Sequence, residues 1–338
     1  MKRSCYCGKV DESFIGKEIV VSGWVHSRRD HGGVIFIDLR DREGLVQIVF
    51  QPEKKEIFAQ AEHLRSEYVL SVKGLVRNRP EGTVNPNMFT GKVEIVVNEL
   101  EIINTSPVLP LEVDDYKETS EEIRLKYRYL DLRRPSFQKN FILRHKISQT
   151  IREYLNKEGF LEIETPFLTK STPEGARDFL VPARLAHGCF YALPQSPQIF
   201  KQILMVAGFD KYYQIARCFR DEDLRADRQP EFTQVDIEMS FVEQQDIINL
   251  VEGLLVDTFK VIGAEVKAPF PVMTYHDAME KYGSDRPDVR FGLELFDITD
   301  IIMESEFTII KDTINAGGIV RAIKIPGIAT YSRKEIDD

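Results

Sequence analysis

Long apolar runs are missing from this 338-residue sequence. The longest of them, such as Ile19-Val20-Val21, fall far short of the roughly 20 apolar residues that a bilayer-spanning helix needs. Residues 1–6 contain no apolar stretch of the signal-peptide type. The sequence therefore predicts a protein without a membrane role.

Cysteine is also scarce, with four residues in the chain. Cys5 and Cys7 lack the second pair of ligands that a zinc tetrahedron requires, and Cys189 and Cys218 stand alone. We expect no metal site and a reducing, cytoplasmic setting. The sequence has no G-x-G-x-x-G pattern, no Walker lysine loop and no internal repeat, which argues against a Rossmann or P-loop type of nucleotide site.

The net charge of −9 argues at first against a nucleic-acid partner, but the charge is unevenly distributed. Residues 1–106 hold 15 Lys and Arg and 15 Asp and Glu, so the acidic excess lies entirely after residue 106. A neutral first region can still present a basic face, and its expected turns carry Arg28, Arg29, Arg40, Arg42, Arg77 and Arg79. A solvated charged surface is the alternative.

Five stretches of this first region are rich in β-branched and aromatic residues: 19–26, 34–40, 45–50, 68–79 and 92–102. One helix, at about 56–64, falls between the third and the fourth. This order is typical of an OB-fold, a small β-barrel that binds single-stranded nucleic acid across its second and third strands. Phe36 could stack on a base, Gln47 could read a base edge, and Arg28 and Arg29 could contact phosphates. Phe36 could equally belong to the core.

The second region follows a linker that bears prolines and acidic residues. It predicts a long helix over 136–158, a strand over 160–166, a helix over 197–207, strands over 212–219 and 232–240, and a helix over 243–262. A hairpin of long strands flanked by helices indicates an antiparallel α+β core. We divide the chain into 1–106, a linker at 107–135, a core at 136–287 and a further part at 288–338.

Three stretches of this second region are more polar than a structural turn or strand needs. Residues 171–178 form a loop with Glu174 at its tip, which taken alone is typical of a surface turn. Residues 195–202 begin a helix whose polar face carries Gln198, Lys201 and Gln202, and this face fits a small anionic ligand and plain solvation equally well. Residues 218–238 carry charges of both signs on two strands and a loop. Burying so many charges only for stability is costly, so we interpret them as a binding site.

These stretches resemble class II aminoacyl-tRNA synthetases. Residues 160–168, with Pro166, resemble motif 1 of that class, and residues 219–222 with the strand from Phe232 resemble motif 2. An OB-fold in front is similar to the aspartate, asparagine and lysine subgroup, and residues 171–178, 195–198 and 225–232 look like the bacterial aspartyl type. The resemblance covers essentially the whole chain and implies an anticodon-binding barrel, part of an antiparallel catalytic core and the start of an insertion domain.

The resemblance also implies roles for individual residues. L-aspartate would be activated by ATP, carried with Mg²⁺, and transferred to the 3′ end of tRNA-Asp by a dimer formed through motif 1. Arg220 would be catalytic, and the aspartate-binding residues would be Glu174, Gln198, Lys201, Arg220 and Asp236. The ATP-binding residues would be Arg220, Asp221, Glu222, Gln229 and Phe232. The anticodon-binding residues would be Arg28, Arg29, Phe36, Gln47 and Glu94.

His31 and Gly82 concern the choice of tRNA. Relatives with histidine and glycine at these places resemble a relaxed type that charges both tRNA-Asp and tRNA-Asn. Glycine removes a side chain that could reject the wrong base, and histidine offers donors and acceptors to either base. The alternative is that His31 is simply a polar turn residue.

One departure from the class concerns its third motif, a glycine-rich strand and helix with an ATP-binding arginine. Nothing after Ser240 resembles it, and residues from about Asp288 look like the beginning of the insertion domain. We therefore expect the rest of the core beyond Asp338 and negligible activity from residues 1–338 alone. Two rival functions remain: a sister synthetase for asparagine or lysine, and a non-catalytic RNA-binding relative.

Overall fold

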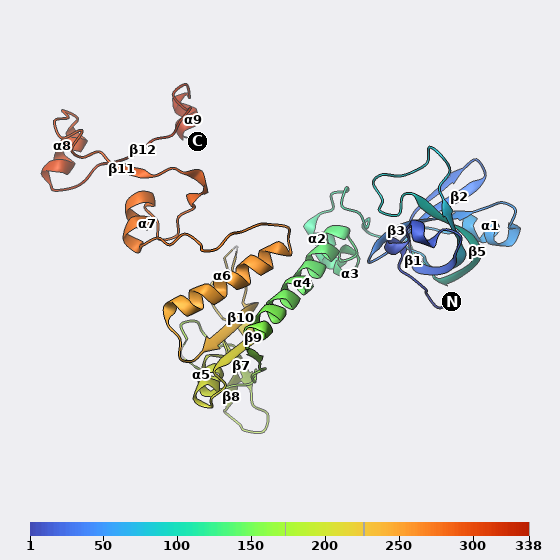
Figure 1. The fold of residues 1–338 in the computed structure, drawn as a ribbon, viewed down its shortest axis with the longest axis horizontal. Helices are drawn as coiled ribbons and strands as arrows, with labels where there is room; N and C mark the ends of the chain where they lie inside the picture. Colours follow the sequence, from blue (N-terminus) through green and yellow to red (C-terminus); the bar gives the residue numbers. More distant parts are fainter. Residues whose placement is uncertain (173, 226, 338) are drawn as a thin grey trace. The chain divides into compact units, whose positions relative to one another are not determined.

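The computed structural model describes residues 1–172, 174–225 and 227–337. Pro173 and Ala226, which belong to two of the polar stretches above, and Asp338 lie outside the described residues. The chain divides into two compact units, Met1–Glu158 and Gly159–Asp338 (Figure 1). The four-part division drawn from the sequence stays a prediction.

A closed five-stranded β-barrel forms much of the first unit and is drawn in blue to teal in Figure 1. Its strands are β1 (Glu18–His31), β2 (Val34–Asp41), β3 (Gly44–Phe50), β4 (Val69–Asn78) and β5 (Val93–Asn104), in the order β1-β2-β3-β5-β4. β3 and β5 pair in parallel, and the other neighbours are antiparallel. Two short helices, η1 (Cys7–Lys9) and η2 (Glu12–Phe14), precede β1, and α1 (Lys55–Glu62) lies between β3 and β4. The predicted OB-fold is confirmed.

Alternate residues of the strands fill the interior of the barrel. On β2, Ile35, Ile37 and Leu39 are fully buried members of the core. Successive side chains of a strand point to opposite faces, so Phe36 and Asp38 lie on the outer face of the barrel. Phe36 is partly buried and lies outside the core cluster. Each buried aliphatic side chain stabilises the fold by about 1.5–3 kcal/mol.

β1 and β2 are joined by the two-residue turn Gly32-Gly33. His31 pairs with Val34, and the backbone angle φ is +62° at Gly32 and +77° at Gly33. Positive φ at both central residues defines a type I′ turn, whose twist matches that of the flanking strands. Glycine adopts this conformation without strain, so the pair of glycines fixes where β1 ends and β2 begins.

A buried ion network ties the barrel to the segment that follows it. Glu67 is 4 % exposed, and its φ of +64° is a left-handed value. Arg40 Nη2 donates to both carboxylate oxygens of Glu67, at 2.7 and 2.8 Å, and Arg133 Nη1 donates to Oε2 at 2.7 Å. Arg133 lies beyond the barrel, after α2 (Glu121–Lys126) and α3 (Arg128–Asp131) and just before the long helix α4 (Pro135–Lys157). One carboxylate thus joins β2 to the segment between α3 and α4.

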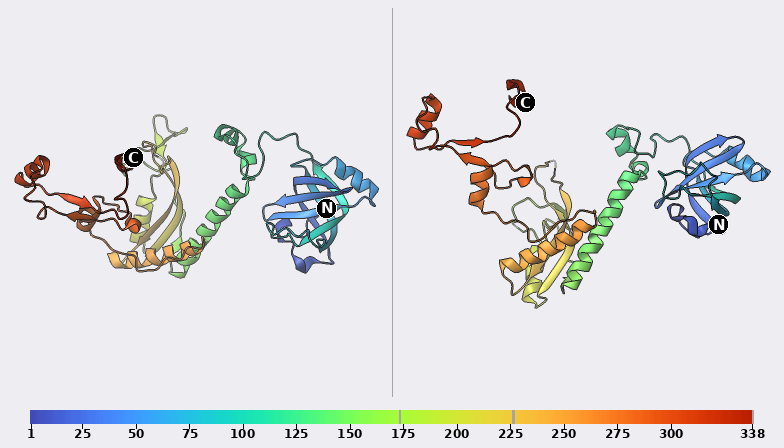
Figure 2. Two further views of the ribbon diagram at one scale, coloured as in Figure 1. Left: turned by 90° about the horizontal axis from the view of Figure 1, so that it is seen from above. Right: turned by 45° about the horizontal axis from the view of Figure 1, so that its top comes forward.

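The second unit is built on a long hairpin, shown from two further sides in Figure 2. β9 (Lys211–Phe219) and β10 (Glu231–Met239) pair antiparallel, and β6 (Leu161–Glu162) joins β9 in parallel. α5 (Gln198–Val206) precedes the hairpin and α6 (Gln244–Lys260) follows it. The predicted hairpin and both helices are confirmed to within one or two residues. The strand predicted over 160–166 is confirmed only over Leu161–Glu162, ahead of Pro166, which has no N–H to donate.

The remaining elements of this unit are short. They are β7 (Leu180–Pro182), β8 (Phe190–Ala192), α7 (Tyr275–Tyr282), η3 (Val289–Phe291), β11 (Leu295–Asp297), α8 (Thr308–Asn315), β12 (Arg321–Ile323) and α9 (Arg333–Asp337). β7 pairs with β8 and β11 with β12. Within the described part of the chain, no helix is long and apolar enough to cross a membrane.

Candidate functional site

The β9–β10 hairpin presents one polar face. Residues that lie directly opposite one another in an antiparallel pair point to the same side of the sheet. The pairs on this face are Glu238 with Tyr212, Asp236 with Gln214, Gln234 with Ala216, and Phe232 with Cys218. The register therefore brings the alternating polar residues of β10, expected from the sequence, onto a single surface.

Lys201 of α5 reaches this face. Its Nζ donates to Asp236 Oδ1 at 2.8 Å and lies 3.3 Å from Glu238 Oε2. Burial alone would lower the pKa of Lys201, but its hydrogen bonds and the charges of Asp236 and Glu238 outweigh that effect, so the pKa is raised. Lys201 is therefore a cation at neutral pH. Gln198 lies three residues earlier on α5 and is half-buried.

Asp236 has one oxygen that its surroundings leave unsatisfied. The residue is 2 % exposed, and Oδ1 accepts from Lys201 and, at 3.1 Å, from Gln234 Nε2. Oδ2 is buried and finds no hydrogen-bond partner among the described residues. A buried carboxylate oxygen without a donor is costly, which indicates that a ligand supplies one. An ammonium group is the donor that suits a carboxylate best.

Arg220 follows β9 at the edge of the same face. Its guanidinium carbon lies 5.1 Å from the centre of the Phe232 ring, which is cation–π geometry. Its backbone N–H donates to Pro230 O at 2.9 Å, and its buried Nε finds no acceptor in the described part of the structure. The guanidinium is thus held against an aromatic ring with donors still available for an anion.

Residues 174–177 of the predicted loop are held to the end of β9 and to the start of α5. Asp221 N–H donates to Arg177 O at 3.0 Å, and Ser196 Oγ donates to Glu174 Oε2 at 2.8 Å. Gln195, which is 1 % exposed, accepts from Ala176 N–H at 3.2 Å and donates to Ala176 O at 2.8 Å. The carboxylate of Glu174 is thereby fixed on the same side as Ser196.

Cys218 lies opposite Phe232 on this face, and the charged groups of these elements act on its thiol. Burial raises the pKa of its thiol to about 11, with Asp236 and Glu174 raising it further and Arg220 and Lys201 lowering it. Phe232, against which Arg220 lies, is directly opposite Cys218 in the hairpin, and Asp236 with its partner Lys201 lies on the same face. The structure therefore places Lys201, Arg220 and Asp236 along one face of the hairpin and holds Glu174 against Ser196, and the binding roles of these residues stay predictions.

Other predicted residues lie further out on the loop between β9 and β10. Glu222 forms an ion pair with Arg228 at 3.6 Å. Asp221 and Gln229 are exposed. The sequence did not assign a role to Gln195 or Ser196. Their role depends on the loop that packs against them, which the sequence does not show.

A second polar surface lies on the outer face of the barrel. Arg29 Nη2 donates to Asp38 Oδ1 at 2.8 Å and to Gln47 Oε1 at 3.3 Å, and Gln47 Nε2 donates to Glu94 Oε2 at 2.8 Å. Phe36 pairs with Arg29 across β1 and β2, so the ring lies on this same face. An aromatic ring beside an arginine and an amide is the combination that single-stranded nucleic acid requires.

The remaining barrel candidates lie apart from this network. Arg28 is turned toward α1, where its Nε donates to Ala61 O at 3.3 Å. His31 is exposed at the end of β1. Gly82, with φ of +78°, is exposed in the loop after β4, and a side chain added there would meet open space.

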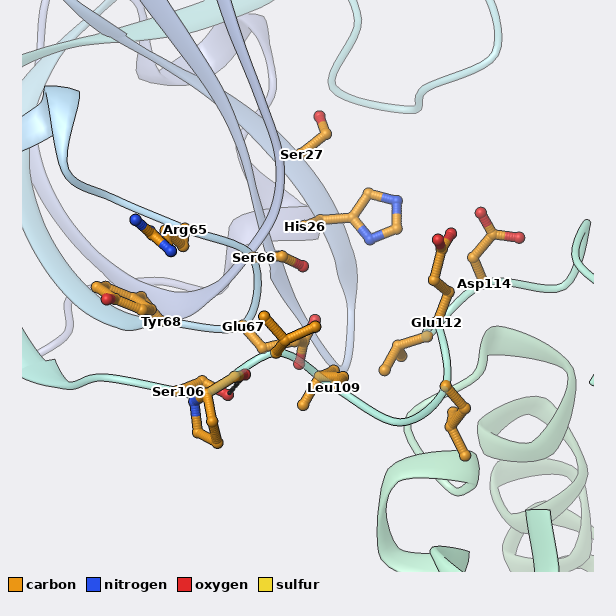
Figure 3. Close-up of a pocket in the computed structure, with 14 residues that line it drawn as sticks. His26, Ser27, Arg65, Ser66, Glu67, Tyr68, Ser106, Leu109, Glu112 and Asp114 are labelled. Carbon is orange, nitrogen blue, oxygen red and sulfur yellow. Dashed lines mark hydrogen bonds between the residues drawn. The ribbon is translucent and has the colours of Figure 1, made fainter. Parts of the chain in front are cut away.

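A pocket of about 780 Å³ lies elsewhere on the first unit, between the barrel and the segment after it (Figure 3). His26 and Glu67 contribute to its wall from the barrel, and Glu112 and Asp114 from the following segment. None of the residues predicted for catalysis or RNA binding lines it.

The chain matches two family models. Residues 120–316 match "tRNA synthetases class II (D, K and N)", and residues 19–103 match "OB-fold nucleic acid binding domain". The first match spans both the hairpin face and the loop that carries Glu174. The chain belongs to the class II tRNA synthetases of the D, K and N group, and the resemblance inferred from its motifs is confirmed.

Similar curated proteins carry a more particular name. The chain is 68 % identical over 337 residues to "Aspartate--tRNA(Asp/Asn) ligase" of Endomicrobium trichonymphae, and 59 % identical over 339 residues to the protein of that name from Thermodesulfovibrio yellowstonii. The matches cover 99 % and 100 % of this chain but 58 % and 57 % of the two relatives. The chain thus spans somewhat more than half of their length.

Solved structures agree on the fold. Asparaginyl-tRNA synthetase from Pyrococcus horikoshii, complexed with asparaginyl-adenylate, is 25 % identical with a TM-score of 0.72, covering 90 % of this chain and 72 % of the other. A putative aspartyl-tRNA synthetase from Leishmania major Friedlin is 22 % identical with a TM-score of 0.65, covering 75 % and 51 %. The fold class predicted from the sequence is confirmed.

Proposed function

We propose that the protein activates L-aspartate with ATP and transfers the aspartyl group to the 3′ end of tRNA-Asp and, in the relaxed form of the activity, of tRNA-Asn. The observation that carries this proposal is the grouping of Lys201 and Arg220 with Asp236, whose Oδ2 has no donor among the described residues. L-aspartate has one ammonium and two carboxylates, and this site holds the opposite charge for each of them.

The selectivity for aspartate rests on the donors of Lys201. Its ammonium has three N–H donors, of which Asp236 and Glu238 take two. The third is left for the β-carboxylate of the substrate. Asparagine would place a neutral amide against this cation and gain less. Asp236 Oδ2, with Glu174 and Gln198, would hold the substrate ammonium.

Arg220 and Phe232 form the ATP side of the site. Arg220 would bind the α-phosphate together with the substrate carboxylate, and Phe232 would stack its free face on adenine. Asp221, Glu222 and Gln229 would complete the contacts to ATP from the loop that follows β9. An oxygen of the aspartate α-carboxylate attacks the α-phosphorus, and pyrophosphate leaves. The 3′-terminal ribose hydroxyl of tRNA then attacks the acyl carbon, and AMP leaves.

ATP is expected to arrive as its Mg²⁺ complex, in which the ion neutralises phosphate charge. No three His, Cys, Asp or Glu side chains lie together as a metal site among the described residues.

The barrel would read the anticodon. The placement of Phe36, Arg29, Gln47 and Glu94 on one outer face supports this role, with Arg28 beside α1 as a further phosphate contact. Gly82 leaves open space where strict enzymes would carry a lysine, and His31 offers donors and acceptors to either base where they would carry a bulkier apolar residue. Relatives named for both tRNA-Asp and tRNA-Asn support the relaxed reading.

We also propose a cytoplasmic homodimer formed through motif 1. Apolar side chains are exposed around this motif: Leu161 is 51 % exposed, Phe167 47 % and Leu168 53 %. A two-fold interface would cover them. All four cysteines are free, which fits the reducing compartment expected from the sequence.

The test is amino-acid-dependent exchange of pyrophosphate into ATP by the protein translated from the complete reading frame. Exchange should depend on aspartate, with little from asparagine or lysine. Arg220→Gln should abolish this exchange. Arg217→Gln should not, because Arg217 is exposed and pairs with Glu231 on the other face of the hairpin. Exchange driven by asparagine or lysine, or an active Arg220→Gln variant, would overturn the proposal.

A further inference from the structure

One polar chain crosses the outer face of the barrel and involves all five strands. Ser27 and Arg29 on β1 donate to Asp38 on β2, at 2.6 and 2.8 Å. Arg29 also donates to Gln47 on β3. Beyond it, Gln47 and Arg77 of β4 both donate to Glu94 of β5, at 2.8 and 2.9 Å.

A negatively charged residue such as Asp38 is unexpected on a surface that binds a polyanion. It is 6 % exposed, so its charge has lost most of its hydration, and it would repel nearby phosphates. Both of its oxygens are occupied from within the barrel: Oδ2 accepts from Ser27 Oγ and Oδ1 from Arg29 Nη2. The carboxylate therefore accepts hydrogen bonds from the protein itself, and neither oxygen is left to bind a ligand.

Arg29 is the group that Asp38 holds. Its side chain remains 52 % exposed. Its bonds to protein acceptors, within the described residues, use Nη2, which leaves the N–H groups of Nε and Nη1 for RNA. An arginine on a free surface loses rotamer entropy when it binds, and an arginine already fixed in place loses less.

The same bonds fix Gln47. Its Oε1 accepts from Arg29 while its Nε2 donates to Glu94, which leaves the amide one orientation. One N–H of Gln47 stays available for a base edge. An amide that could flip would exchange donor for acceptor and blur the discrimination between bases.

We propose that Asp38 is a positioning residue for RNA recognition, which fixes the guanidinium of Arg29 and, through it, the amide of Gln47. The proposal rests on the proposed anticodon-binding function of the barrel. It makes a prediction of unexpected sign, because removing a negative charge from an RNA-binding face should tighten binding by simple electrostatics, whereas loss of the positioning group should weaken it.

The experiment measures the dissociation constant of tRNA-Asp at several salt concentrations for the protein translated from the complete reading frame. Asp38→Asn should weaken binding about tenfold and lower the salt slope by about one, as expected when one phosphate contact is lost. Asp30→Asn is the matched control. It removes the same charge from an exposed site on β1, where the carboxylate forms only a 3.8 Å ion pair with Arg28. Arg28 keeps its bond to Ala61 O, so binding should stay equal or tighten slightly.

A double-mutant cycle separates positioning from general damage. If Asp38 acts through Arg29, adding Asp38→Asn to Arg29→Gln should cost almost nothing more. A full additional loss would overturn the proposal, as would an Asp38→Asn single variant that binds as tightly as wild type. If wild type itself fails to prefer tRNA-Asp over a tRNA with an unrelated anticodon, the proposed function of the barrel falls, and this proposal falls with it.

A second variant keeps the test decisive if Asp38→Asn does not fold. Arg29→Lys keeps the positive charge, but an ammonium that donates to Asp38 and Gln47 has only one N–H left and lacks the Nε and Nη1 donors that Arg29 offers to RNA. Binding should fall nearly as far as in Arg29→Gln, and the salt slope should fall less. Wild-type affinity in Arg29→Lys would show that charge alone suffices and would overturn the proposal.

Discussion

Replacing Lys201 by methionine should destabilise the β9–β10 hairpin more than the removal of a charged side chain from an exposed ion pair does. The side chain of Lys201 is 12 % exposed and that of Asp236 2 %. Breaking a buried ion pair on one side costs about 3–5 kcal/mol, because the remaining charge is left uncompensated. Asp236 would keep the donor of Gln234, and Glu238, at 31 % exposure, can regain water. We therefore expect the lower end of that range, about 3 kcal/mol.

The measurement must report on this hairpin and not on the barrel. The single tryptophan of the chain, Trp24, lies on β1, so its fluorescence follows unfolding of the barrel. Hydrogen exchange of peptides from β9 and β10 reports the opening of the hairpin instead. A loss of about 3 kcal/mol should accelerate that exchange roughly a hundredfold, while the Trp24 transition stays in place.

Lys260→Met is the matched control, because it makes the same substitution in an exposed pair with Asp257 on α6, 64 % and 42 % exposed. Exposed ion pairs contribute little to the free energy of unfolding, so hydrogen exchange of the hairpin peptides should hardly change. Equal acceleration in both variants, or none in Lys201→Met, would refute the reasoning.

The pH dependence of this effect has a definite sign. The pKa of Lys201 is raised above its ordinary value of 10.5. A group with a raised pKa in the folded state stabilises fully below its unfolded pKa, and that contribution is lost as pH rises through the folded value. The difference between wild type and Lys201→Met should therefore be constant across neutral pH and shrink only above about pH 10.5.

Three further predictions concern the barrel. Glu67→Gln should lower the free energy of unfolding of the barrel, followed by Trp24 fluorescence in urea, by about 3–5 kcal/mol, and an unchanged midpoint would contradict the buried ion network. Phe36→Ala should weaken tRNA binding about tenfold or more because one stacked base is lost, unless the ring serves only to cover the barrel, in which case affinity will not change. His31→Leu should reduce aminoacylation of tRNA-Asn relative to tRNA-Asp; a wild-type enzyme that strongly prefers tRNA-Asp, with no response to this change, would rule out the relaxed specificity.

The barrel was predictable because its signals are local. The β-branched and aromatic run at 34–37 and the glycine pair 32–33 mark a strand and a turn within a short stretch of sequence. Five such strands with a helix after the third are the order typical of an OB-fold. β6 was harder to predict: it is two residues long, and pairing with β9 decides its ends.

The site was predictable in its residues but not in their contacts. The spacing of Gln198 and Lys201 places both on one helix face, yet the pairing of Lys201 with Asp236 and Glu238 depends on how α5 packs on β10. Glu94 was expected to contact RNA, and the structure adds that both of its oxygens already accept from Gln47 and Arg77. No sequence pattern marks such long-range partners.

The carboxylate shared by Arg40 and Arg133 sets a rule for exchanging this barrel between proteins. A transplant cut in the linker near residue 106 would leave Glu67 with one of its two arginines and would carry a half-satisfied buried charge into its new host. A transplant that runs through Arg133 keeps the pair intact. The transferable module of this protein therefore ends after α3, at Arg133, about thirty residues after its last barrel strand.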